Sequence, residues 1–176
     1  MREKFRVAVI GHTGRGNYGH GLDTVWLDLP ECELLAVADA DERGRGAAAS
    51  RLKVQKAYAD YRNMLDEVKP DIVSIGPRWA DQHRDMVVEV ASRGIHIYLE
   101  KPMCRSLREA DEMIEACEKS GSKLAIAHQT RYSPRLQVVR ELLADDVIGE
   151  LLEIRGRGKE DHRGGGEDLW AVSYTH

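Results

Sequence analysis

The sequence predicts an α/β fold of the Rossmann type, a doubly wound parallel sheet, followed by the beginning of an incomplete second α/β domain. Short apolar runs alternate with segments of helical periodicity, and these runs lack the strict polar alternation of a half-exposed strand. Such runs are typical of parallel strands buried on both faces. The first run, 5–10, leads into five glycines within residues 11–21. A glycine-rich turn after a buried strand is the layout that holds a pyrophosphate.

Composition and charge exclude several other classes of protein. Of the 176 residues, 42% are hydrophobic and 32% are charged, which are ordinary values for a globular chain of one α/β domain and a little more. The net charge of −4 does not favour nucleic-acid binding, and no apolar run approaches the length of a membrane span. The chain enters its first strand directly after Lys4, so we expect no signal peptide.

The three cysteines indicate a reducing compartment. Cys32, Cys104 and Cys117 are scattered and lack C-x-x-C spacing. This pattern is typical of reduced thiols and not of a disulfide framework or a zinc site. We therefore expect a cytoplasmic protein without a metal centre.

The expected strands follow from apolar runs that end in turn residues. The run 33–38 comes after Pro30 and ends at Asp39, and a later run ends at Gly76-Pro77. Glycine, proline and acidic residues at these places close a strand. The expected strands cover 5–10, 33–38, 56–58, 72–75, 96–99 and 123–127.

Apolar periodicity predicts a helix between each pair of strands. Leu22, Val25, Trp26 and Leu29 recur at helical spacing directly after the glycines. The Ala- and Arg-rich segment 42–52 also favours a helix, although it contains two glycines. Proline or glycine ends several of the later helices, and the sequence Ser-Leu-Arg-Glu forms a capping box at the start of one of them. These later helices are expected over 61–68, 82–93, 106–121 and 134–144.

The glycine motif has two possible registers. Gly14-x-Gly16-x-x-Gly19 matches G-x-G-x-x-G, but it begins three residues after Gly11, where the strand should end. The alternative, Gly11-x-x-Gly14-x-Gly16, carries an extra residue in the turn. Both registers let the backbone approach a phosphate closely, whereas the simplest alternative is an ordinary flexible loop.

Asp39 is the second residue that indicates a dinucleotide site. A carboxylate at the end of the second strand accepts hydrogen bonds from the adenosine ribose hydroxyls in such folds. The alternative is a solvated turn acid. A carboxylate here also repels a 2′-phosphate, which favours NAD over NADP, although Arg43 and Arg45 lie close enough in sequence to soften that preference.

Glu100-Lys101-Pro102 follows a buried strand, where ligands of open α/β sheets bind, and a lysine there can transfer protons. The alternative is a surface lysine in a turn before a helix. In the order of its segments, the chain resembles the Gfo/Idh/MocA oxidoreductases, an NAD(P)-dependent family of sugar and polyol dehydrogenases. The resemblance rests on Val9-Ile10-Gly11, Asp39, Gly76-Pro77 with His83, Gly94-Ile95-His96-Ile97, Glu100-Lys101-Pro102, Arg131-Tyr132-Ser133-Pro134 and Ile148-Gly149-Glu150.

The resemblance implies a role for each matching position. Lys101 would be the active-site lysine, beside the nicotinamide and the substrate hydroxyl, with Pro102 helping to set its backbone. The substrate would be a small sugar or polyol and the cofactor NAD. The residues assigned to cofactor binding are Gly11, Gly14, Gly16, Asp39, Gly76, Pro77, His83, Glu100 and Lys101.

The resemblance also implies two domains. We expect a dinucleotide-binding domain over 1–148 and the start of a truncated substrate and oligomerisation domain over 149–176. The segment 151–158 has strand-forming residues but no partner strand, so we expect disorder in the dilute monomer and self-association at higher concentration. His176 could match the family's catalytic histidine, although a frayed terminal residue is the preferred interpretation.

Three functions remain compatible with these residues. The first is hydride transfer between a nicotinamide and a carbinol carbon, with this chain alone expected to bind cofactor without turnover. The second is a non-catalytic module that binds or senses NAD. The third is a methyltransferase-like fold that uses the glycine loop and Asp39 for an adenosyl ligand, but this explains neither Lys101 nor the segment after Gly149.

Overall fold

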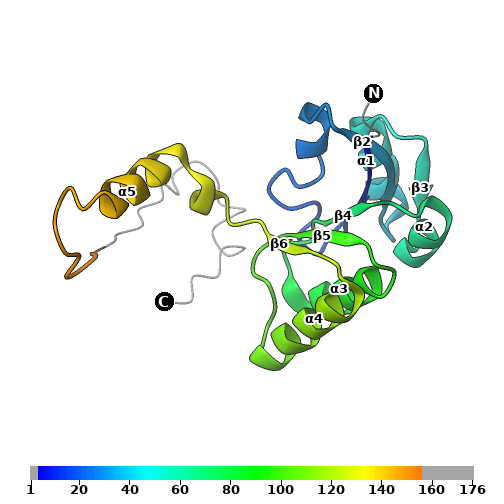
Figure 1. Cartoon of the computed structure of the whole chain (residues 1–176). Coiled ribbons are helices and arrows are strands. Elements are labelled where there is room, and N and C mark those ends of the chain that lie inside the picture. Colours follow the sequence, from blue (N-terminus) through cyan, green and yellow to red (C-terminus); the bar gives the residue numbers. More distant parts are fainter. Residues whose placement is uncertain (1–3, 156–176) are drawn as a thin grey trace. The chain divides into compact units, whose positions relative to one another are not determined.

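The computed structural model describes residues 4–155. The chain divides into two compact units, Met1–Ala127 and His128–His176. The first unit contains a parallel six-stranded sheet in the order β3-β2-β1-β4-β5-β6 (Figure 1). This arrangement is the predicted doubly wound sheet. Its strands are β1 (Phe5–Ile10), β2 (Cys32–Ala38), β3 (Lys56–Tyr58), β4 (Ile72–Ile75), β5 (His96–Leu99) and β6 (Leu124–Ile126).

Apolar side chains on both faces of the sheet form two cores. Successive residues of a strand point to opposite faces, so Val9 joins the core beneath α1, whereas its neighbour Ile10 joins the core beneath α2, α3 and α4. This double burial explains why the strands lack polar alternation. The helices are α1 (Glu42–Leu52), α2 (Tyr61–Val68), α3 (His83–Ala91) and α4 (Leu107–Ser120) in the first unit, and α5 (Pro134–Ala144) in the second.

Local caps define the ends of the long helix α4. The Ser106 hydroxyl accepts a hydrogen bond from the Glu109 amide at 3.2 Å, as the predicted capping box requires. The Glu109 carboxylate instead accepts from the Arg105 amide at 2.9 Å, one residue before the cap. Gly121 ends the helix with a φ of 73°, a backbone conformation that glycine adopts without a Cβ penalty.

The helix predicted directly after the glycines is wrong. Residues 11–24 form turns, and only Val25–Asp28 form a single 3₁₀ turn, η1. An α-helix would need the Leu22 carbonyl to accept from the Trp26 amide, but this carbonyl accepts from the Trp26 indole at 2.9 Å and the Ser74 hydroxyl at 2.7 Å. A tertiary contact therefore competes successfully with the helical hydrogen bond.

Two short 3₁₀ turns accompany the later elements. Ala80–Gln82 form η2 directly before α3, so that helix begins one residue later than predicted. Gln129–Tyr132 form η3 before α5. No helix among residues 4–155 is long and apolar enough to cross a membrane.

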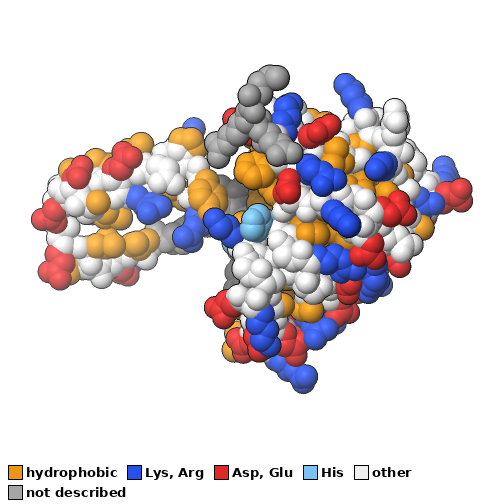
Figure 2. Space-filling model, turned by 45° about the vertical axis from the view of Figure 1, so that its right-hand side comes forward, with side chains coloured by type: hydrophobic (Ala, Val, Ile, Leu, Met, Phe, Trp, Pro, Cys, Tyr) orange, Lys and Arg blue, Asp and Glu red, His pale blue; other side chains and the backbone are white. Residues whose placement is uncertain are grey.

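The second unit exposes many apolar side chains, several of which are visible in Figure 2. It begins at His128 and includes α5, and the domain boundary predicted at 148 stays a prediction. The strand predicted over 151–158 is absent from residues 151–155, which have no regular secondary structure, and its remaining residues lie outside the described part.

Candidate cofactor-binding site

The candidate site lies at the carboxyl ends of the strands, where the strand order reverses. From β1 the chain runs outward through β2 to β3 and then returns to β4 on the other side of β1. Ligands of open α/β sheets bind at such a switch point. A cavity of about 250 Å³ lies there, and its lining includes Gly11, His12, Asp39, Asp60, Tyr61 and Gln82.

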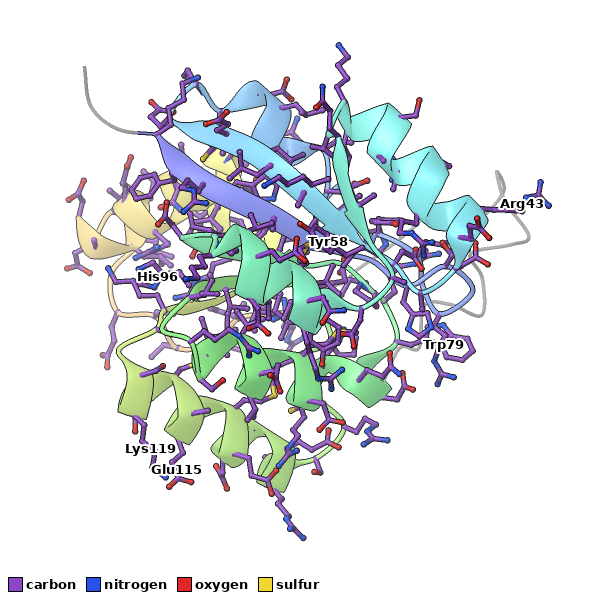
Figure 3. The ribbon with its side chains drawn as sticks, turned by 90° about the vertical axis from the view of Figure 1, so that its right-hand side faces the viewer. Arg43, Tyr58, Trp79, His96, Glu115 and Lys119 are labelled. Carbon is purple, nitrogen blue, oxygen red and sulfur yellow. The ribbon has the colours of Figure 1, made fainter. Side chains whose placement is uncertain are left out.

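A larger hollow of about 750 Å³ lies at the opposite, amino-terminal edge of the sheet. His96, at the start of β5, marks this edge in Figure 3, whereas Trp79, which follows β4, marks the carboxyl edge. Several polar groups of the hollow are already paired: Asp71 accepts from the Arg6 amide at 2.7 Å, and Arg93 contacts Asp66, which also lines the hollow, at 2.9 Å. The smaller cavity, at the carboxyl ends of the strands, is therefore the better candidate for a cofactor site.

Asp39 is held at the end of β2 by hydrogen bonds from the glycine-rich turn. The side chain is buried, and its Oδ2 accepts from the Thr13 hydroxyl at 2.7 Å and the Tyr18 hydroxyl at 2.9 Å. Its Oδ1 accepts from the Asp41 amide at 3.0 Å. Burial, and secondly the hydrogen bond to Asp39, raise the pKa of Tyr18 well above its ordinary value. The hydroxyl of Tyr18 therefore stays a donor.

The glycines allow the turn to pack tightly against the strand ends. A Cβ on Gly11 would lie 2.1 Å from the Tyr18 ring, and one on Gly16 would lie 2.3 Å from the Arg78 amide nitrogen. Gly14 has no atom within 4 Å of such a Cβ, but its φ of 83° favours glycine. The three predicted glycines thus serve either close approach or a left-handed backbone.

Glu100 and Lys101 follow β5 at the same edge. The buried Glu100 carboxylate accepts from the His20 amide at 2.9 Å through Oε2 and from the Lys101 amide at 2.9 Å through Oε1. The Lys101–Pro102 peptide is cis. Among residues 4–155, the half-buried Lys101 side chain forms no ion pair, which leaves its amine available to a ligand.

His83 joins the two loops that follow β4 and β5. The ring is fully buried, with Nε2 2.6 Å from the Pro77 carbonyl oxygen and Nδ1 2.9 Å from the Pro102 carbonyl oxygen. Both ring nitrogens therefore face the backbone, and His83 supports the turn that carries Lys101. Gly76 packs against Tyr18, since a Cβ there would lie 3.0 Å from the Tyr18 backbone. The other catalytic candidate, His176, lies outside the described residues.

Side chains of the glycine-rich turn also contact the segment after β4. His12 Nδ1 lies 2.7 Å from Gln82 Oε1. The Arg15 guanidinium pairs with Asp81 and lies 5.1 Å from the centre of the Trp79 ring. These contacts hold the turn across the switch point.

Sequence analysis did not identify Thr13, Tyr18 and His20, whose donors engage the two strand-end carboxylates. Their only signal is the position of polar groups between glycines. No cluster of three or more His, Cys, Asp or Glu side chains that could hold a metal occurs among the residues searched, 4–155.

Two curated proteins are similar to this chain. D-apiose dehydrogenase of Paraburkholderia graminis is 31% identical over 147 residues, which cover 84% of this chain and 38% of that protein. D-xylose 1-dehydrogenase (NADP⁺) 2 of Haloferax volcanii is 32% identical over 134 residues, which cover 75% of this chain and 41% of that protein. The chain thus spans about two fifths of the length of these relatives.

Solved structures show the same fold. An NAD-binding oxidoreductase of Klebsiella pneumoniae is 27% identical with a TM-score of 0.70, and the match covers 84% of this chain and 40% of that one. An oxidoreductase of Agrobacterium radiobacter, solved with NAD⁺, L-tartaric acid and magnesium, has a TM-score of 0.74 at 23% identity, over 84% of this chain and 42% of that one.

A model of the Gfo/Idh/MocA oxidoreductase family, described by its NAD-binding Rossmann fold, matches residues 5–128. These residues include every strand of the sheet and both strand-end carboxylates. Because the match covers more than half of the 176 residues, the chain belongs to the Gfo/Idh/MocA family of oxidoreductases.

Proposed function

We propose that the chain is the dinucleotide-binding part of an NAD(P)-dependent dehydrogenase that acts on a carbinol carbon of a sugar or polyol. The observation that carries this proposal is the position of Lys101, directly after the buried Glu100 at the carboxyl edge of the sheet, with an amine that forms no ion pair among residues 4–155. Relatives that are D-apiose, D-xylose and myo-inositol dehydrogenases support the substrate class.

The residues at the switch point fit a nicotinamide dinucleotide. The close packing at Gly11 and Gly16 shows that the turn has no space for side chains at these two positions, as a backbone that approaches a pyrophosphate requires. Asp39 and Glu100 supply buried carboxylates that can accept from ribose hydroxyls. The bound cofactor would supply the hydride acceptor or donor.

Lys101 would transfer the proton on oxygen. In the oxidation direction, the Lys101 amine would accept the hydroxyl proton of the substrate as the C=O bond forms, while the bound cofactor would supply the acceptor for the hydride from the same carbon. In reduction, the Lys101 ammonium returns that proton to the developing alkoxide. The hydrogen bonds of His83 to the neighbouring turn would keep the amine in a defined place.

The carboxylate of Asp39 supports NAD over NADP as cofactor, since a 2′-phosphate would lie close to its negative charge. Arg45 donates to the Asp39 carbonyl at 2.7 Å, so one guanidinium also lies at this end of β2. Arg43 points away from the helix into solvent in Figure 3.

Thermal unfolding with NADH, NADPH and S-adenosylmethionine tests the proposal. A ligand at one hundred times its Kd stabilises the native state by about 2.7 kcal/mol. We expect NADH to raise Tm more than NADPH, and S-adenosylmethionine to leave Tm unchanged. A rise with S-adenosylmethionine alone would instead support the methyltransferase-like alternative.

Turnover separates an enzyme from a binding module. NAD reduction by the purified chain should be measured with a panel of sugars and polyols, including D-xylose and myo-inositol. We propose that the chain alone binds the cofactor without turnover, and measurable reduction would contradict this part. If a chain extended to the length of its relatives also binds NADH without turnover, the non-catalytic module becomes the better interpretation.

A further inference from the structure

Both strand-end carboxylates are engaged by one segment, residues 12–21, which we call the glycine loop. Asp39, at the end of β2, accepts from the hydroxyls of Thr13 at 2.7 Å and Tyr18 at 2.9 Å. Glu100, at the end of β5, accepts from the His20 amide at 2.9 Å, and His20 Nδ1 lies 3.1 Å from the same oxygen. The loop thus supplies the donors that two buried carboxylates require.

Tyr18 covers the switch point itself. Its ring lies against Gly11 at the end of β1, and its backbone lies against Gly76 at the end of β4. The Arg51 guanidinium also lies over the ring, 5.0 Å from the ring centre, and Arg51 in turn pairs with Asp23 at 2.6 Å. Tyr18 is consequently buried in the place where a pyrophosphate would approach Gly11.

Two donors of the glycine loop are hydroxyl groups, like those that a ribose would offer. A ribose offers hydroxyl groups to a carboxylate, and Asp39 already receives two hydroxyl donors from the loop. A bound nucleotide and the closed loop would therefore compete for the same lone pairs. Because the carboxylate is buried, it needs one set of donors or the other.

We infer that the glycine loop is a latch: in the free protein it occupies the carboxylates that would bind the two riboses, and the cofactor enters only after Tyr18 and His20 release them. The inference rests on the proposed function, because the displacing ligand is taken to be a nicotinamide dinucleotide. The inference adds to the proposed function a closed state of the free protein, held by the side chains of Thr13, Tyr18 and His20.

The local structure allows such an opening. In place of an α-helix, the loop is followed by the single 3₁₀ turn Val25–Asp28. All four of its glycines, at positions 14, 16, 19 and 21, have φ values between 68° and 87°. The hydrogen bonds that opening would break at Asp39 and Glu100 are replaced by those of the ribose, so the exchange leaves neither carboxylate unsatisfied.

A latch has two measurable consequences. The apparent Kd for NADH equals the intrinsic Kd divided by the fraction of open protein, so weakening the latch tightens binding. The observed association rate should also level off at high NADH concentration, because opening must precede binding.

Tyr18→Phe is the main test, because it removes one hydroxyl donor and keeps the ring on Gly11. NADH binding should be followed by fluorescence titration and by stopped flow. Loss of one charge-assisted hydrogen bond from the closed state should lower the apparent Kd about tenfold and raise the rate plateau. Thr13→Val is the second variant and should act in the same direction.

Tyr58→Phe is the matched control. The Tyr58 hydroxyl, at the end of β3, donates to Glu67 at 2.9 Å and so makes a similar bond that does not involve the loop (Figure 3). This variant should leave both the Kd and the rate plateau unchanged. Equal or weaker NADH binding by both Tyr18→Phe and Thr13→Val, with a wild-type protein that binds NADH, would overturn the latch and leave the proposed function intact.

Amide hydrogen exchange tests the latch in the case in which no cofactor binding is observed. If neither the wild type nor any variant binds NADH or NADPH, the proposed function fails. The closed loop is then tested without ligand: the Thr13 and His20 amides should be protected in the wild type and less protected in Tyr18→Phe. Unprotected amides in the wild type would show that the latch does not exist.

Discussion

Among the described residues, Asp39 and Glu100 are the most deeply buried carboxylates, with 2% and 1% of their surface exposed. Burying a carboxylate without donors is very costly, and each one here receives several. Their positions after β2 and β5 could be predicted from the sequence, because local patterns mark strand ends. Their partners could not, since Thr13, Tyr18 and His20 are brought to them only by the folded loop.

The first prediction concerns cofactor choice. Asp39→Ser should weaken NADH binding and narrow the difference between NADH and NADPH by about 1 kcal/mol or more, because a charged acceptor for the ribose is lost. The affinity ratio from parallel fluorescence titrations is the correct measure, since the variant also removes the acceptor for Tyr18. An unchanged ratio would rule out Asp39 as the residue that selects the cofactor.

The second prediction separates binding from chemistry at Lys101. In this chain, Lys101→Ala should change the Kd for NADH little, because the carboxylates and glycines remain. In a chain extended to the length of its relatives, it should lower kcat by about 10²–10⁴, the usual contribution of a general acid or base. Retention of most turnover in that extended variant would refute the proton-transfer role.

The third prediction concerns His83. Replacing it by Leu removes the ring contacts to the carbonyl groups of Pro77 and Pro102, and a buried carbonyl left without its donor costs about 1–3 kcal/mol of unfolding free energy. Urea denaturation measures this loss. His128→Leu, at an exposed position, is the control, and equal stability of the two variants would contradict the supporting role of His83.

At the scale of secondary-structure elements, the predicted bounds agree with the structure where the contacts that stabilise an element are local in sequence. The helices from α1 to α5 begin and end within two residues of the prediction, apart from small 3₁₀ extensions, because their caps and apolar faces are local in sequence. The helix predicted after the glycines does not form, because the Leu22 carbonyl accepts a hydrogen bond from Ser74, which is 52 residues further along the chain. Periodicity within a short window contains no information about such a contact.

The two glycines of α1 provide a fourth prediction with an internal control. Gly46→Ala should stabilise the protein by about 0.5–1 kcal/mol, because the site is open and alanine favours a helix. Gly44→Ala should destabilise it, since the new Cβ would lie 1.8 Å from the Thr13 hydroxyl oxygen. Thermal unfolding of both variants measures the difference, and equal stabilisation by the two would contradict the packing of Thr13 on α1.

For the molecule as a whole, the parallel pairing of the strands follows from the alternation of strands and helices, whereas the strand order is known from the structure. The division into two compact units was not predicted from the sequence. Composition changes after Gly149, where the predicted domain boundary stays a prediction, whereas the compact units divide at His128, before η3 and α5. Composition reports which residues are present, whereas a structural boundary depends on which residues contact one another.

The fifth prediction concerns self-association through the second unit. Val147, Ile148, Leu152 and Ile154 each expose between 62% and 87% of their surface, which is unusual for large apolar side chains. We expect the protein to associate as its concentration rises, and Leu152→Glu together with Ile154→Lys to reduce this association. Sedimentation velocity over a range of concentrations measures it. A monomer at every concentration would contradict the prediction.

The central place of β1 in the sheet also has a consequence for synthesis. β1 leaves the ribosome before the other strands of this sheet, but one of its two neighbours is β4, and the Arg6–Asp71 contact that accompanies their pairing spans 65 residues. At about 5–20 residues per second, that neighbour arrives roughly 3–13 s later. Until then, one side of β1 has unpaired backbone groups in a nascent chain. Holding this apolar strand apart from other strands during those seconds is a task suited to a ribosome-associated chaperone.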